Sequence, residues 1–173
     1  KGSYGTVYLV QSITDSTKVA AMKKISRKAM RKASLGLGSD AEVLQEVAVM
    51  KMLTHKHVVN LFEVIDDTAN DEILIVQEYM EYGPVMTEKE YNQPLELLVA
   101  RKYLREMLLG LEYLHYQGVV HRDVKPSNLL VGADGVCRLA DFGAAALTDD
   151  TERGWVRDIK GTPAFQPPEC FAE

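Results

Sequence analysis

The first half of the chain alternates apolar and polar residues at the two-residue period of β-strands. From Tyr4 to Ile25, β-branched residues flank the turn SITDST, which predicts two strands joined by a hairpin. Two more strands are expected in HVVNLFEVI and EILIVQEYM, on either side of the polar turn DDTAND. Between these pairs, the S-x-x-E pattern of Ser39–Glu42 is typical of a helix N-terminus. The predicted stripe of that helix consists of Leu44, Val47, Ala48 and Lys51.

The period becomes helical after Gly83 and Pro84. The residues that recur at helical spacing are Leu104, Met107, Leu108, Leu111 and Leu114. This stripe favours packing into a core, and Gly118 is the expected end of the helix. The segment NLLVGADGVCRLA then predicts two short strands joined by a turn at ADG.

These patterns predict an α+β chain of two lobes joined by the linker EYMEYGP. Residues 1–83 would form a small β-rich N-lobe with one helix. Residues 84–173 would form part of a mainly helical C-lobe.

Composition excludes several classes of protein. Of the 173 residues, 46% are hydrophobic and 26% charged, so the chain is expected to fold rather than remain disordered. A net charge of -5 disfavours nucleic acid as a partner. The sequence has neither a run long enough for a membrane span nor a signal pattern at its start, so we expect a cytoplasmic chain, with the nucleus as an alternative. Cys137 lies in an apolar run and is interpreted as a core residue, while the histidines follow no metal-binding pattern.

Polar residues gather in VVHRDVKPSNLLVGADGVCRLADFG, residues 119–143, which contains H-R-D-x-x-x-x-N followed by D-F-G. This combination resembles the signature of the protein kinases, whose phosphoryl transfer requires positioned groups and neutralised charge rather than covalent help. Asp123 would accept the proton of an acceptor hydroxyl, and Lys125 would meet the transferring phosphate. Asn128 and Asp141 would hold Mg²⁺ through oxygen ligands. Taken alone, Asp123 would be interpreted as an acid that caps a turn.

The resemblance to the protein kinases implies a two-lobed kinase-like fold with ATP and Mg²⁺ as cofactors. KGSYGTV is similar to the end of the family's glycine-rich loop. By this resemblance, Gly2 and Gly5 approach the phosphates and Val7 covers the adenine.

The resemblance extends to the rest of the nucleotide site. AAMKK is similar to V-A-I-K, which implies that Ala21 and Lys23 bind the nucleotide and that Glu46 is the ion-pair partner of Lys23. Glu42 is the rival carboxylate, although the expected cap uses it. Strand alternation predicts that Lys24 points to the opposite face. The remaining expected nucleotide contacts are Gln77 as gatekeeper, Glu78, Met80 and Leu130.

DVKPSN and GTPAFQPPE are similar to serine/threonine kinases, in which the residue corresponding to Thr162 positions the acceptor hydroxyl. A closer resemblance is to the calcium/calmodulin-dependent protein kinase kinases and related upstream activators of energy-sensing kinases. It is carried by EVAVMKMLTHKHVVNLFEVIDD, GPVM, GLEYLHYQGVVHRDVKPSNLLVGADG and GTPAF. This resemblance implies a protein substrate, namely a threonine in the activation loop of another serine/threonine kinase. Calmodulin is a candidate regulator, through a segment outside these residues.

The chain departs from that pattern in places, and two other functions are considered. The short AMRKASLGLGSD replaces a proline-rich insert of the subfamily, and Pro167 stands where the family has alanine. A pseudokinase scaffold is one alternative, which the intact catalytic motifs oppose. A small-molecule phosphotransferase is another, which the G-T-P run opposes. Because the sequence stops just after PPE, we expect a kinase fragment with an incomplete C-lobe and weak activity, a naturally minimal kinase being the alternative.

Overall fold

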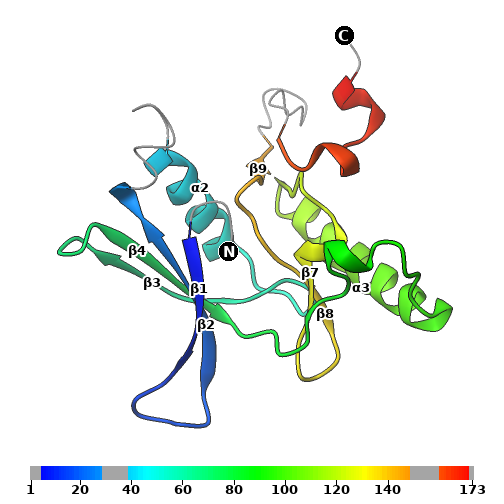
Figure 1. The fold of residues 1–173 in the computed structure, drawn as a ribbon. Coiled ribbons are helices and arrows are strands. Elements are labelled where there is room, and N and C mark those ends of the chain that lie inside the picture. Colours follow the sequence, from blue (N-terminus) through cyan, green and yellow to red (C-terminus); the bar gives the residue numbers. More distant parts are fainter. Residues whose placement is uncertain (1–4, 29–38, 149–159, 172–173) are drawn as a thin grey trace.

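The structure is a computed structural model that describes residues 5–28, 39–148 and 160–171. A four-stranded sheet and one helix form the first part, and a second helix with a short β-hairpin forms the other, as Figure 1 shows. These are the β-rich lobe and part of the helical lobe of an α+β, two-lobed fold. Gly2 and residues 149–159, which follow Thr148, lie outside the described residues.

The sheet of the first lobe consists of strands β1, β2, β4 and β3 in that order, all antiparallel. Their bounds are β1 Gly5–Gln11, β2 Val19–Ser26, β3 Leu61–Asp67 and β4 Glu72–Glu78. The predicted hairpin between the first two strands is confirmed: the Asp15 carboxylate accepts hydrogen bonds from the backbone and hydroxyl of Thr17 within its turn. The register sets Lys23 opposite Val7 and Ile75.

Helix α2 (Ser39–Met52) lies against this sheet. Its buried apolar residues are Val43, Val47, Val49 and Met50. The predicted stripe is wrong at Ala48 and Lys51, which are exposed. The buried face instead follows residues 43, 46, 47 and 50, because that face meets Ile25, Ile73 and Ile75 of the sheet. The side chains of Leu44 and of the expected capping box, Ser39–Glu42, lie outside the described part.

The chain between α2 and β3 joins the two lobes. We expected a strand from His57, but β3 begins only at Leu61. Residues 57–59 run beside strand β8 (Cys137–Leu139) instead: Leu139 donates its amide to the His57 carbonyl at 2.9 Å, and Val59 donates to the Leu139 carbonyl at 2.9 Å. The segment is apolar because it is buried between the lobes, rather than within the upper sheet.

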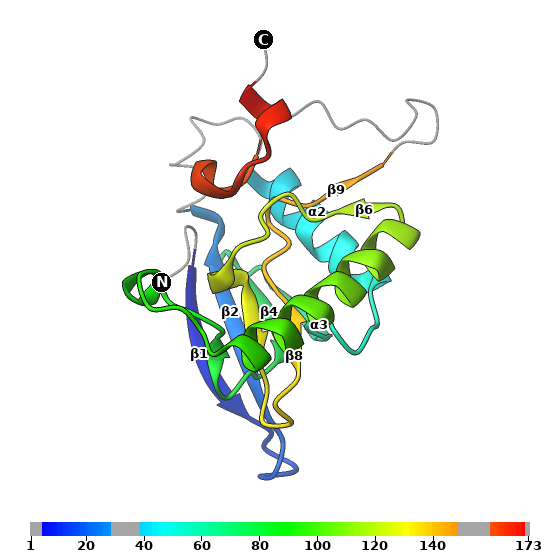
Figure 2. The same cartoon turned by 90° about the vertical axis from the view of Figure 1, so that its right-hand side faces the viewer.

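The second lobe contains helix α3 (Leu97–Tyr116), which runs along β8 (Figure 2). A Cβ on Gly110 would lie 2.7 Å from the His57 carbonyl oxygen, so this glycine permits the close approach. The helix ends before Gly118, whose φ of 68° is the left-handed conformation expected of a helix stop. The predicted core stripe is wrong at Leu104 and Leu108, each 54% exposed, because the described elements cover only one side of α3.

Short strands and turns complete this lobe. The strands are β5 Gly83–Pro84, β6 Val119–Val120, β7 Leu129–Val131 and β9 Ala146–Leu147. The 3-10 turns are η1 Glu88–Glu90, η2 Pro126–Asn128, η4 Pro163–Phe165 and η5 Pro168–Phe171. Strand β7 pairs with both β5 and β8, and β6 pairs with β9. The predicted hairpin around ADG is therefore confirmed.

One hydrophobic core extends through both lobes, from Ile25 and Ile75 to Leu114 and Phe142. Cys137 lies within it with none of its surface exposed, as predicted, and burial raises the pKa of its thiol to about 12. Neither helix of the described ranges has the length and apolarity to cross a membrane. The described histidines, cysteines and acids form no cluster suited to a metal ion.

Candidate active site

A cleft of about 630 Å³ lies where the two lobes meet. Its upper wall consists of Val7, Lys23, Glu46, Met50 and Gln77. Its lower wall consists of Asp123, Lys125, Ser127, Asn128, Leu130, Ala140, Asp141, Gly143, Ala144, Lys160, Gly161 and Thr162. The volume is in the range of about 300 to 1,000 Å³ typical of small-molecule sites. Nine residues predicted from the sequence to bind nucleotide or carry catalysis therefore share one cavity.

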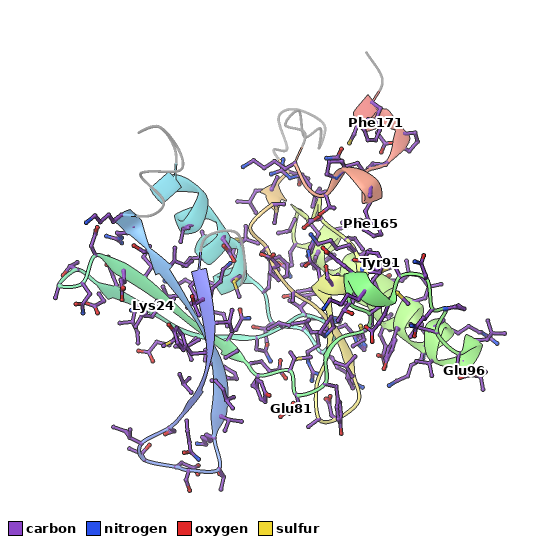
Figure 3. The ribbon with its side chains drawn as sticks, viewed as in Figure 1. Lys24, Glu81, Tyr91, Glu96, Phe165 and Phe171 are labelled. Carbon is purple, nitrogen blue, oxygen red and sulfur yellow. The ribbon has the colours of Figure 1, made fainter. Side chains whose placement is uncertain are left out.

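Lys23 provides the positive charge of the upper wall. Strand alternation turns its side chain toward α2, where its Nζ donates to Glu46 Oε1 at 2.7 Å. Asp141 Oδ1 lies 3.9 Å from the same nitrogen. Lys24 points to the other face of the sheet (Figure 3) and pairs with Glu72 at 2.8 Å. The predicted pairing of Lys23 with Glu46 is thus present. Because Glu46 is buried, this ion pair holds the lysine side chain against α2.

Asp123 lies at the centre of the lower wall. Its Oδ1 accepts hydrogen bonds from the Thr162 amide at 2.8 Å and the Thr162 hydroxyl at 2.7 Å. Its Oδ2 lies 2.8 Å from Lys125 Nζ, and this ammonium also donates to Thr162 Oγ1 at 2.6 Å. Burial opposes ionisation of Asp123, but the hydrogen bonds from Lys125 and Thr162 outweigh it and lower its pKa. The carboxylate is therefore ionised at neutral pH.

Two oxygen-bearing side chains flank this base. Asn128 is buried at the end of η2, and its Nδ2 donates to the Asp123 carbonyl at 2.9 Å and to Asp123 Oδ2 at 3.0 Å. Its amide oxygen is the atom that could bind a cation. The Asp141 side chain is 55% exposed, and its backbone has a φ of 64°, an uncommon conformation for a residue other than glycine. A carboxylate and an amide oxygen suit Mg²⁺, and Lys23 suits the phosphates of a nucleotide, so this cleft fits MgATP.

His121 holds the loop that carries Asp123, a role that was not predicted from the sequence. The ring is buried, its Nδ1 accepts from the Asp123 amide at 3.2 Å, and its Nε2 donates to the Ala140 carbonyl at 3.1 Å. Burial lowers the pKa of His121, partly offset by the bond to Ala140. A neutral ring with its proton on Nε2 satisfies both contacts. The residue that could have indicated this role is the histidine of the H-R-D motif.

Four predicted nucleotide contacts that the structure describes lie outside the lining of the cleft. Gly5 pairs with Ile25 in the sheet, and Ala21 is buried in β2 opposite Gln77. Met80 is buried against Val59, Ala140 and Leu130, and the Glu78 side chain turns toward Arg138. The side chains of Glu78 and Met80 have these other partners, so their predicted contact with a nucleotide stays a prediction.

Several lining residues were not predicted, among them Met50, Lys160 and Gly161. Gly161 has a φ of 102°, and a Cβ there would lie 2.2 Å from the Arg122 carbonyl oxygen. Only glycine fits this crossing, which brings Thr162 onto Asp123. The G-T-P run could have indicated Gly161, whereas Met50 enters the cleft through helix packing that has no local signal.

The comparison with protein families agrees with this geometry. The model described as "Protein kinase domain" matches residues 1–173. Because this match spans the whole sequence, the chain belongs to the protein kinase domain family.

The relatives that resemble the chain are named as protein kinases. A Dictyostelium discoideum protein named "Probable serine/threonine-protein kinase" is 41% identical over 98% of the chain, which covers 24% of that protein. SNF1-activating kinase 1 of Saccharomyces cerevisiae is 38% identical over 99% of the chain and 17% of its own length. A calcium/calmodulin-dependent protein kinase kinase of Caenorhabditis elegans is 42% identical over 76% of the chain and 24% of its own length. The chain thus spans about a quarter or less of these relatives.

Proposed function

We propose that the protein is a serine/threonine protein kinase, which transfers the terminal phosphoryl group of MgATP to a serine or threonine hydroxyl of a protein. The observation that supports this most directly is the position of the Thr162 hydroxyl, 2.7 Å from Asp123 Oδ1 and 2.6 Å from Lys125 Nζ. A hydroxyl between a carboxylate and an ammonium is arranged for proton removal and charge neutralisation together. An acceptor hydroxyl would require the same two groups.

Different residues of the cleft would serve the phosphates, the cation and the acceptor hydroxyl. MgATP, when bound, supplies the phosphoryl group and a cation that offsets its charge. Lys23, oriented by Glu46, would bind phosphate oxygens at the upper wall, while Asn128 and Asp141 would hold the cation. Asp123 would take the hydroxyl proton as the new oxygen–phosphorus bond forms and the bond between the terminal phosphorus and the departing ADP breaks. Lys125 offsets the negative charge beside the transferred group.

The finer proposal concerns the substrate, a threonine in the activation loop of another protein kinase. It is supported by relatives whose names describe an SNF1-activating kinase and a calcium/calmodulin-dependent protein kinase kinase. Control by calmodulin, through a segment outside these residues, belongs to the same proposal. The subfamily motifs in α2 and around the catalytic loop are consistent with both.

The test uses the full-length protein with labelled MgATP and three acceptors. These are a kinase with its activation-loop threonine, the same kinase with that threonine changed to valine, and a mixture of small-molecule alcohols. We expect label on the first protein alone, and at least about 100-fold slower labelling by an Asp123→Asn variant. Label on the small molecules would indicate the phosphotransferase alternative. No transfer to any acceptor, with MgATP still bound, would indicate a pseudokinase scaffold. Label on the valine variant would refute the activation-loop assignment only.

A further inference from the structure

Arg138 in β8 contacts Glu78, the first residue of the linker between the lobes, and is not among the residues that line the cleft. Its side chain is only 11% exposed. Its Nε lies 3.3 Å from Glu78 Oε2, and its two terminal nitrogens bind the Asp134 carboxylate at 3.0 and 2.8 Å. The fork to Asp134 lowers the pKa of that carboxyl to about 2. A guanidinium bound by two carboxylates has a fixed position, because its planar fork meets one of them in a bidentate geometry.

Glu78 is the residue that this cluster fixes. It ends strand β4, so it is the last residue of the upper sheet before the linker. Its Oε2 also accepts from the Asn60 amide at 3.3 Å, while its own amide donates to the Asn60 carbonyl at 2.9 Å. Glu78 is therefore held from two directions, by the chain that joins the lobes and by β8 of the lower lobe.

The remainder of the linker rests on the same hairpin. The Glu81 carboxylate accepts from the Ala133 amide at 2.8 Å, and Figure 3 shows Glu81 on the segment that joins the two lobes. Tyr82 donates its amide to the Val131 carbonyl at 3.0 Å. Glu81 and Tyr82 thus join the linker to the hairpin. Arg138 adds a contact from the same hairpin to Glu78, at the end of the upper sheet.

The cluster is placed to act on the linker rather than on the reacting groups. Arg138, Glu78 and Asp134 are absent from the described lining of the cleft, which contains the phosphate-side residues Lys23 and Asp123. Burying a charged group among carboxylates adds little net stability, because desolvation offsets most of the attraction. What such a cluster provides is a single conformation for the backbone to which it is bound.

We propose that Arg138 is a positioning residue that, through Glu78, fixes the linker backbone against which the adenine of ATP binds. This proposal rests on the proposed kinase function. By the resemblance to protein kinases, the linker from Glu78 to Pro84 would contact the adenine, whereas Lys23 and Asp141, which line the cleft, would serve the phosphates. Loss of Arg138 should therefore weaken recognition of the base and leave recognition of the phosphates unchanged.

The experiment compares MgATP with magnesium tripolyphosphate, which has the phosphates but no base, by calorimetric titration of the full-length protein. We expect Arg138→Met, which keeps the apolar stem, to raise the dissociation constant for MgATP about three- to tenfold, the size of effect that lost preorganisation produces. Affinity for tripolyphosphate should not change. Arg138→Lys should be intermediate, since it keeps the charge but loses the fork.

The matched control is Lys102→Met. Lys102 donates to the Gly135 carbonyl in the same hairpin, so it is another cation that anchors this turn, but none of its contacts in the described residues reaches the linker. We expect Lys102→Met to bind both ligands as the parent does. Asp134→Asn, at an exposed position, should weaken MgATP binding less than Arg138→Met and in the same direction.

Each outcome separates this inference from the kinase proposal. If the parent does not bind MgATP, the kinase proposal fails. If the parent binds it and Arg138→Met binds it equally well, or loses both ligands in the same proportion, the positioning role of Arg138 is refuted. Should Arg138→Met not fold, Asp134→Asn decides the question, and an unchanged ratio of the two affinities in that variant refutes the role.

Discussion

Lys23 and Lys24 show how one position of strand register separates a functional residue from a surface residue. Both are lysines of β2, yet Lys23 faces Glu46 and the cleft, and Lys24 faces Glu72 on the outside of the sheet. Successive side chains of a strand point to opposite faces, so the two differ only in parity. This pair provides its own matched control.

We expect Lys23→Met to reduce phosphoryl transfer at least about 100-fold, since the phosphates lose a partly buried point charge. Glu46 is left without its partner, which should cost about 1 to 3 kcal/mol of unfolding free energy and leave the fold intact. Lys24→Met should transfer at nearly the parent rate. Transfer assays with saturating acceptor and thermal unfolding test both variants. Near-normal turnover by Lys23→Met would contradict the role of this lysine.

Asp123→Asn should lower kcat on the order of 10²- to 10⁴-fold, the usual contribution of a general base. Asparagine keeps the size of the side chain and can still bind Thr162, so the Kd for MgATP should change little. Steady-state kinetics and calorimetric titration distinguish the two effects. A variant with normal kcat and weakened nucleotide binding would assign Asp123 to the nucleotide rather than to the acceptor.

His121 should make the fold sensitive to acid. Its pKa is lowered from 6.5 chiefly by burial, so the unfolded chain takes up its proton near pH 6.5 while the folded chain resists. The free energy of unfolding should therefore fall as the pH drops below 6.5, by up to about 1.4 kcal/mol per pH unit, until the folded ring also protonates. His121→Gln cannot titrate. Urea unfolding between pH 7 and 5 should show a steeper loss in the parent than in this variant, and parallel curves would contradict the assignment.

At the scale of elements, contacts within the protein hold residues 144–148, the described part of the segment that follows D-F-G. The side chain of Arg122 donates to the carbonyls of Ala144 and Ala145 at 2.5 and 3.3 Å. Thr148 donates its amide and its hydroxyl to the Gly118 carbonyl at 2.7 and 3.1 Å, where β6 and β9 pair. A loop phosphate would normally supply such order by binding an arginine.

We therefore expect the Thr148→Ala, Thr151→Ala double variant to keep its transfer activity within about threefold of the parent, because the loss of one hydroxyl contact costs only about 0.5 to 1.5 kcal/mol. The sequence also suggests that Asp149, Asp150 and Glu152 offer carboxylates in place of a phosphate. These three acids and Thr151 lie outside the described residues. Assays of protein produced without any kinase treatment test the expectation, which a silent double variant would overturn.

The strands, the hairpin turns and the motif residues could be predicted from the sequence because each depends on local chemistry. Gly118 follows the end of α3, as expected of a helix stop, and Lys23 meets Glu46, as the resemblance to the kinase motifs implied. The errors concern partners that are distant in sequence. Helical spacing gave α3 an apolar face that includes Leu104, but it does not specify what covers that face.

Long-range contacts explain the remaining omissions in the same way. The apolar run at Val58 fits a strand equally well whether it joins the upper sheet or lies beside β8. In the sequence, Arg138 is one polar residue of an alternating strand. Its role could not be predicted, because its carboxylate partners come from a turn and from the other lobe. Local patterns do not contain that information.

At the scale of the whole molecule, two connections set the relation between the lobes. One is the backbone pairing of residues 57–59 with β8, and the other is the linker of residues 78–84, which rests on the β7–β8 hairpin. Strand β8 takes part in both and leads directly into Asp141. A change in the angle between the lobes would therefore reach Asp141, the proposed cation ligand, through one short strand.

The burial of Cys137 has a practical consequence for following that motion. The chain has two cysteines, and the one in the core has a pKa of about 12, so it is protected from alkylation at neutral pH. Cys170 is partly exposed in η5, eight residues beyond Thr162. Iodoacetamide should modify Cys170 alone in native protein and both residues in denaturant, as peptide mass spectrometry would show. A fluorophore attached at this one thiol would then report when the acceptor side of the cleft rearranges.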